Sequence, residues 1–87
     1  MLNIENVIVF FNFEFMKKLG KNIRIVREMR NLTQEALASA IGYSQKHVSR
    51  IEKGQIQLDD ECIERISKAL KVSPQKLIHL DCKSFLK

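Results

Sequence analysis

Residues 31–54 (NLTQEALASAIGYSQKHVSRIEKG) contain the pattern that decides the fold. Thr33 and Ser44 each precede a short segment of helical spacing. A hydroxyl at that point accepts a hydrogen bond from the exposed N–H groups of a first helical turn. Gly42 lies between the two segments and supplies the positive φ angle that ends a helix at little steric cost. The stretch therefore predicts two short helices joined by a tight turn, over residues 34–41 and 45–53.

The second of these helices carries almost no apolar surface. Only Val48 and Ile51 form an inward stripe, and every other residue from 45 to 53 is polar. The major groove of B-form DNA admits one α-helix, and Gln, Lys and Arg side chains match the hydrogen-bonding edges of adenine and guanine. The pattern therefore indicates a helix that reads base edges; the alternative is an ordinary helical hairpin with a solvated face. The candidate base contacts are Gln45, Lys46, Ser49 and Arg50.

Basic side chains are concentrated around this helix pair. Residues 1–16 have a net charge of −2, residues 17–53 of +6 and residues 54–87 of +1, which together give the +5 of the whole chain. A basic surface attracts polyanions, of which nucleic acid is the commonest, although it can also serve solubility alone. Phosphate would be contacted by backbone N–H groups at the two helix starts and by the side chains of Gln34, Ser44, Lys21 and Lys53.

Three further helices are predicted around this pair. The helix before it has an apolar stripe at helical spacing. It is ended by Asn31, because Asn adopts the left-handed conformation more readily than most residues. The two helices after it begin at an Asp cap and at a Ser-Pro restart. The predicted ranges are residues 16–30, 60–70 and 74–80, which with the central pair form one all-α, five-helix domain over residues 16–87.

Residues 1–15 (MLNIENVIVFFNFEF) have a different pattern. Every odd position from 7 to 15 is apolar, a period of two that predicts a β-strand with one apolar face. A lone strand leaves its backbone N–H and C=O groups unpaired, and no second strand is evident in the sequence. We therefore expect this strand-like extension to pair with its copy in a two-fold dimer; the alternative is an incidental extension before Met16. The dimer face would consist of Val7, Val9, Phe11, Phe13 and Phe15.

Other classes of function have little support. The sequence has no glycine-rich phosphate loop, no metal-ligand spacing and no constellation of nucleophile, base and acid, so no enzyme activity, metal or cofactor is expected. Cys62 and Cys82 are too far apart in sequence for a CxxC motif and fit two free thiols in a reducing cytoplasm. No run approaches the ~20 apolar residues of a membrane span, and neither a signal peptide nor a small-molecule site is evident.

The stretch from Leu19 to Leu80 resembles the Cro/C1-type helix-turn-helix family, also called XRE-like or phage-repressor-like. The matching positions are in register and the stretch covers about 70% of the chain. Departures occur at Asn31 and Lys71, where Gly is usual, at Leu58, where Pro is frequent, and at Asp60, where an apolar residue is frequent. The matching residues are Ile23, Val26, Arg27, Leu32, Thr33, Gln34, Glu35, Leu37, Ala38, Gly42, Ser44, Val48, Ser49, Ile51, Glu52, Gly54, Ile66, Ala69, Leu70, Val72 and Ser73.

The resemblance implies a five-helix repressor-like bundle whose second and third helices read double-stranded DNA. It places the family's base contacts on the same four residues of the second helix and its phosphate-contacting Gln on Gln34. It also implies an ion pair between Arg27 and Glu52 that fixes the reading helix. The expected function is a transcriptional regulator that binds a palindromic operator as a homodimer, since one helix reads too few base pairs for specificity. The rival is an antitoxin-like interaction protein that works mainly through a partner protein.

Overall fold

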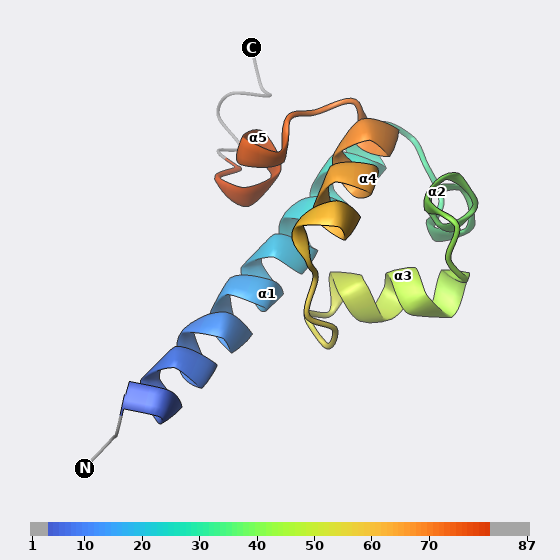
Figure 1. Ribbon diagram of the computed structural model, residues 1–87. Coiled ribbons are helices and arrows are strands. Elements are labelled where there is room, and N and C mark those ends of the chain that lie inside the picture. The colour runs from blue at the N-terminus through green and yellow to red at the C-terminus, as the bar shows by residue number, and fades with distance from the viewer. Residues whose placement is uncertain (1–3, 81–87) are drawn as a thin grey trace.

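The computed structural model describes residues 4–80 and contains five α-helices in that range. They are α1 (Ile4–Met29), α2 (Gln34–Ile41), α3 (Gln45–Glu52), α4 (Asp60–Leu70) and α5 (Pro74–Ile78). The long α1 crosses the molecule, with α2 and α3 on one side and α4 and α5 packed along its C-terminal part (Figure 1). The predicted all-α, five-helix fold is confirmed. The C-terminal residues, including Cys82, Phe85 and Leu86, lie outside the described range.

All five helices contribute to one hydrophobic core. The apolar stripe predicted for the first helix is buried, and so are the inward stripes of the two central helices. Burial of this apolar surface is the main force that holds the short helices in place, since helices of this length are marginal in water by themselves. The fully buried side chains include Leu19, Ile23 and Val26 of α1, Leu37 of α2, Val48 and Ile51 of α3, Ile66 and Leu70 of α4, and Leu77 of α5.

Helix ends follow the predicted capping residues. The hydroxyl of Thr33 accepts from the backbone N–H of Ala36 at 3.0 Å, and that of Ser44 accepts from the N–H of His47 at 3.1 Å. Asp59 and Ser73 cap α4 and α5 in the same way. Asn31 has a φ angle of 58° and Gly42 one of 80°, so both adopt the left-handed conformation that ends a helix. Two helices end slightly earlier than predicted. The helix α3 ends at Glu52 instead of residue 53, and α5 ends at Ile78 instead of residue 80.

The prediction of a β-strand near the N-terminus is wrong. Residues 4–15 are the first turns of α1, which continues without a break to Met29. An apolar run of this length fits both periods, because Ile4, Ile8, Phe11 and Phe15 also recur at three- and four-residue spacing. A helix satisfies its backbone hydrogen bonds internally, whereas a strand without a neighbour cannot. Residues 4–15 are therefore helical and continuous with the rest of α1, so this segment cannot pair as a strand.

A glycine sets the distance between α1 and α3, and sequence reasoning missed it. A Cβ atom on Gly20 would lie 2.3 Å from the backbone oxygen of Ile51 and 2.8 Å from that of Glu52. Both neighbours are backbone atoms at the C-terminal end of α3, so they cannot move aside cheaply. Any other residue at position 20 would force the two helices apart, and Gly20 thereby fixes α3 against the scaffold.

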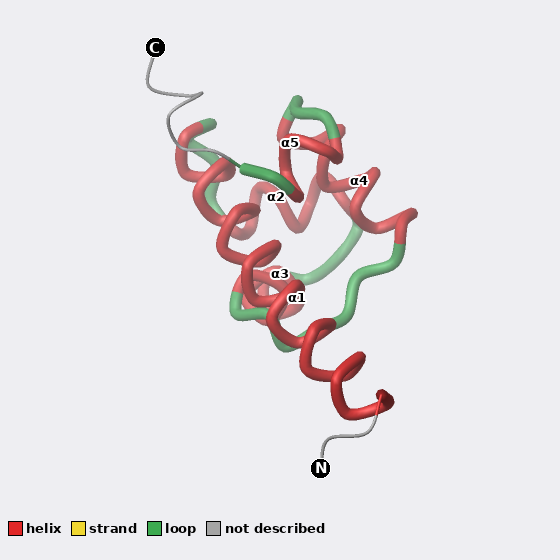
Figure 2. The backbone as a smooth tube through the Cα atoms, turned by 90° about the vertical axis from the view of Figure 1, so that its left-hand side faces the viewer, coloured by secondary structure: helices red, strands yellow, loops and turns green. Residues whose placement is uncertain are grey.

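The free end of α1 projects from this core. The two views agree that its N-terminal part extends away from the other helices (Figures 1 and 2). The first buried residue of the described side chains is Leu19, while Phe13 and Phe15 are 55% and 41% exposed. Within residues 4–80, no helix has both the length and the hydropathy needed to cross a membrane.

Candidate nucleic-acid interface

The candidate interface is the helix pair α2–α3 with the turn between them. The N–H of Tyr43 donates to the carbonyl of Ala38 at 2.9 Å, which completes the left-handed end of α2 at Gly42. Ser44, two residues after Gly42, is the N-cap of α3. The first residues of the two helices, Gln34 and Gln45, are in contact through their side-chain amides. Leu37 and Ala38 of α2 and Val48 and Ile51 of α3 are buried, so the pair is held by its apolar sides.

A buried ion pair ties the end of α3 to α1. Nε of Arg27 lies 2.6 Å from Oε2 of Glu52, and a second nitrogen of the guanidinium donates to Oε1 at 3.2 Å. The side chains are only 10% and 3% exposed. The third guanidinium nitrogen donates to the backbone oxygen of Leu32 at 2.7 Å. The bidentate geometry and the extra carbonyl satisfy the donors of a desolvated Arg, as a buried charge requires. The pair implied by the family resemblance is therefore present.

Hydrogen bonds continue from this pair to the start of α3. Oε1 of Glu52 accepts from the side-chain amide of Gln34 at 3.0 Å. The amide oxygen of Gln34 in turn accepts from the side-chain amide of Gln45 at 3.2 Å. Gln34 is the first residue of α2 and Gln45 the first of α3. The candidate phosphate contact and a candidate base contact are thus joined, and both are connected to the scaffold through Glu52.

The remaining candidate contacts lie on the outer side of the pair. Lys46 and Arg50 of α3 are exposed, and Ser49 is half-buried. Lys53, the C-cap of α3, and Lys21 on α1 are exposed. The hydroxyl of Ser44 accepts from the N–H of His47, so only its remaining hydrogen-bonding capacity is open to a phosphate. The outer face of α3 therefore presents amide, ammonium and guanidinium groups opposite an apolar inner face.

The N-terminal residues predicted for a dimer face are distributed around a helix. Residues 7, 9, 11, 13 and 15 alternate between opposite sides when the backbone is helical, because successive residues are about 100° apart. Phe13 and Phe15 are exposed. The side chains of Val7, Val9 and Phe11 lie outside the described part of the chain. These five residues therefore cannot form the single face that a strand would have given them.

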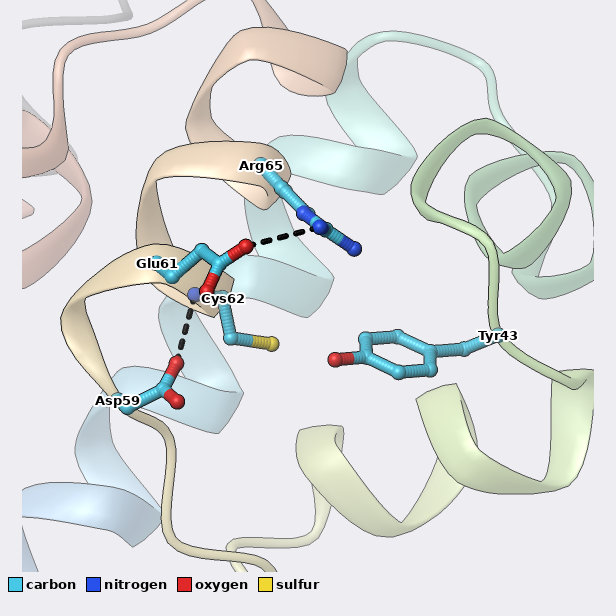
Figure 3. Close-up of a pocket in the computed structure, with 5 residues that line it drawn as sticks. All are labelled: Tyr43, Asp59, Glu61, Cys62 and Arg65. Carbon is cyan, nitrogen blue, oxygen red and sulfur yellow. Dashed lines mark hydrogen bonds and ion pairs between the residues drawn. The ribbon is translucent and has the colours of Figure 1, made fainter.

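Tyr43 is a contact residue that the sequence did not reveal. Its ring lies 4.5 Å from the ring of His47, tilted by 33°, and it points from the α2–α3 turn toward Cys62 at the start of α4 (Figure 3). A cavity of about 160 Å³ lies between these elements, lined by Tyr43, Asp59, Glu61, Cys62 and Arg65. The Cys62 thiol raises the pKa of Tyr43, and burial raises the pKa of Cys62. Both groups therefore stay protonated near neutral pH and act as packing contacts.

A family model described as helix-turn-helix matches residues 23–77, and the chain belongs to this family of DNA-binding regulators, in its Cro/C1-type form. The chain is 41% identical over 56 residues to the uncharacterized HTH-type transcriptional regulator y4wC of Sinorhizobium fredii. That match covers 64% of this chain and 39% of the relative. The chain thus corresponds to about two fifths of that relative's length.

Two solved structures show the same fold over most of the described helices. The restriction-modification controller protein C.AhdI of Aeromonas hydrophila has a TM-score of 0.68 and 31% identity, covering 71% of this chain and 94% of the controller. The P22 c2 repressor, solved in complex with a synthetic operator, has a TM-score of 0.66 and 32% identity. It covers 72% of this chain and 96% of the repressor. The helix pair α2–α3 lies within the residues that the family model matches.

Proposed function

We propose that this protein is a transcriptional regulator that binds a palindromic operator as a homodimer, with α3 of each copy in a major groove. The observation that carries the proposal is the hydrogen-bonded chain from Arg27 through Glu52 and Gln34 to Gln45. It holds the first turn of α3 rigid before DNA arrives. Positioning of this kind reduces the side-chain ordering that binding would otherwise require.

Base edges would be read by the outer face of α3. Gln45 fits the N6/N7 edge of adenine, and Arg50 fits the O6/N7 edge of guanine in a bidentate contact. Lys46 and Ser49 lie on the same face as these two residues, from the helical spacing. Phosphate would be bound by Gln34, Ser44, Lys21 and Lys53, together with the N–H groups that begin α2 and α3.

Two copies are needed because one helix reads only a few base pairs. A two-fold dimer doubles the site and requires half-sites about one helical turn, ~34 Å, apart. The P22 c2 repressor was solved on a synthetic operator, which supports operator binding for a chain with this fold. The proposed DNA partner supports a cytoplasmic site of action, in agreement with the reduced thiols expected from the sequence.

Selection of binding sites from random double-stranded DNA tests this proposal. We expect the selected sequences to converge on an inverted repeat, and a footprint on it to show protection in two adjacent major grooves. Arg50→Ala should flatten the preference at one base pair per half-site. Recovery of random sequences with no common motif would overturn the proposal and would favour the antitoxin-like alternative, in which a partner protein is the main ligand.

A further inference from the structure

We infer that His47 is a further base-reading residue of α3 and that the ring of Tyr43 holds its imidazole in position. This inference rests on the proposed function, because it adds a residue to the same reading face. His47 is not among the four base contacts that the sequence pattern and the family resemblance assign to this helix. The evidence is the place of His47 on α3, its contact with Tyr43 and the way in which Tyr43 is held.

The place of His47 on α3 is equivalent to that of an assigned base contact. Lys46 and Arg50 are exposed and mark the centre of the outer face. Successive residues of an α-helix are about 100° apart, so His47 lies about 80° to one side of this centre and Ser49 about 80° to the other. Both side chains are half-buried. The geometry that makes Ser49 a candidate base contact therefore applies equally to His47.

His47 occupies a flank of the reading face that the assigned residues leave empty. Gln45 and Ser49 lie on the flank beside α2, where Gln45 contacts Gln34. His47 lies on the opposite flank, beside Tyr43 of the turn. A helix that fills the major groove meets base edges along both of its flanks. Without His47, the flank beside Tyr43 would present no hydrogen-bonding side chain from α3.

The ring of Tyr43 packs on one side of the imidazole. The two ring centroids are 4.5 Å apart and the planes are tilted by 33°. The hydroxyl of Ser44 accepts from the backbone N–H of His47 and leaves the side chain untouched. Within residues 4–80 the imidazole nitrogens make no hydrogen bond. The contact with Tyr43 thus restricts the ring while its nitrogen-bearing edge stays available to a ligand.

Tyr43 is held in turn by the start of α4. Its hydroxyl points from the α2–α3 turn toward the thiol of Cys62 (Figure 3). Cys62 is buried, and its backbone N–H donates to the capping carboxylate of Asp59 at 2.8 Å, so the thiol belongs to a fixed helix start. The imidazole of His47 is therefore positioned from α4 through Tyr43, whereas Gln45 is positioned from α1 through Glu52.

The chemistry of imidazole defines the kind of atom that His47 would contact. The ring carries at least one N–H donor whether it is neutral or protonated. Acceptors in the major groove are N7 and O6 of guanine, N7 of adenine and O4 of thymine. Side chains near the N-terminus of a reading helix meet base edges. A base acceptor is therefore the ligand, and Tyr43 is a positioning residue that does not itself touch DNA.

Selection of binding sites with His47→Ala, beside the unchanged chain, tests the contact. One base pair per half-site should lose its preference, and it should differ from the one that Arg50→Ala affects. Affinity for the operator should fall about 5–10-fold, the effect of one hydrogen bond, while affinity for scrambled DNA stays the same. His79→Ala, at the exposed end of α5, removes the other histidine as the matched control and should change neither value. Thermal melting establishes that each variant folds.

Two substitutions of Tyr43 separate positioning from a general effect on the fold. Tyr43→Leu removes the ring and should weaken operator binding about threefold, whereas Tyr43→Phe keeps the ring and should retain most of the affinity. In a chain that already carries His47→Ala, Tyr43→Leu should cause no further loss, because the two residues act as one unit. An equal loss with and without His47 would overturn the positioning role.

Two results would overturn the assignment of His47 itself. One is a His47→Ala variant that selects the same motif with the same affinity. The other is an equal loss of affinity for operator and scrambled DNA, which is the behaviour of a phosphate contact. A failure of the proposed function would look different, because the unchanged chain would then select no common motif at all.

Discussion

The side-chain amide of Gln45 donates to the amide oxygen of Gln34 across the turn between α2 and α3, at 3.2 Å. One residue is a candidate for contacting a base and the other for contacting a phosphate. If both residues contact DNA as proposed, their hydrogen bond would couple the position of the DNA backbone to the orientation of the reading side chain. Gln34 also donates to Glu52, so the coupling extends to the buried ion pair.

Removal of Gln34 should therefore weaken operator binding beyond the loss of one phosphate contact. We expect Gln34→Ala to reduce affinity for the selected operator about tenfold or more, since Gln45 would have to be ordered on binding. Fluorescence anisotropy at fixed salt measures the effect. Gln75→Ala, on the exposed surface of α5, is the matched control. An equal loss of affinity for operator and random DNA would contradict the coupling.

Loss of the carboxylate at Glu52 should destabilise the fold. Glu52→Ala leaves the buried guanidinium of Arg27 without its partner, and removing one member of such a pair costs about 3–5 kcal/mol. Urea denaturation monitored by circular dichroism gives the free energy of unfolding. Glu61→Ala removes an exposed pair with Arg65, away from Arg27, and should leave the free energy of unfolding nearly unchanged. Similar values for the two variants would show that burial of the Arg27–Glu52 pair is unimportant.

Two basic residues near the end of α3 should affect DNA binding differently. Arg50→Ala should cost about 1–3 kcal/mol on the operator and relax preference at one base pair. Lys53→Ala should weaken all sequences alike and reduce the slope of log K against log salt by about one. Titrations at several salt concentrations, on operator and on scrambled DNA, distinguish the two behaviours. A change of base preference in the Lys53 variant would mean that the reading face extends beyond Arg50.

Substitution by alanine should destabilise the fold at two glycine positions, for a different reason at each. Gly20→Ala brings a methyl group against backbone oxygens of α3, so we expect a loss of several kcal/mol, about 3 or more, or failure to fold. Gly42 has a φ of 80° and open space around it, so Gly42→Ala should cost only about 1–2 kcal/mol for the left-handed backbone. Chemical denaturation of both variants gives the loss in the free energy of unfolding at each position. Equal costs would argue against close packing of α1 on α3.

The pKa of Cys62 predicts a loss of stability at alkaline pH. Burial raises the pKa of this thiol above its ordinary value of 9.0, so between the unfolded and folded pKa values the native state holds more protons than the unfolded state. The free energy of unfolding should therefore fall as pH rises above 9.0. Denaturation across this range, compared with Cys62→Ala, measures the contribution. A pH dependence that is the same in both proteins would assign it to other groups.

Much of the fold could be predicted because its signals are local. Thr33, Ser44 and Asp59 act on N–H groups within three residues of themselves, and Gly42 acts through its own φ angle. The apolar stripes of α1 to α4 could be predicted from the helical period alone. The Arg27–Glu52 pair joins residues 25 positions apart, and only the family resemblance brought them together.

Features that depend on distant contacts were missed. The role of Gly20 requires the backbone of α3, and the position of Tyr43 requires Cys62 at the start of α4. Neither contact leaves a signal in its neighbourhood along the chain. The conformation of the N-terminal segment was predicted wrongly for another reason. Its apolar residues satisfy both a period of two and a helical period, and continuity with the helix after it decided the conformation.

The unbroken course of α1 from Ile4 to Met29 has a geometric consequence. A continuous helix fixes the angle between its free end and the part of α1 that packs on α3. Inserting one residue before Gly20 would turn the free end of α1 by about 100° relative to α3 and shift it by ~1.5 Å along the helix axis.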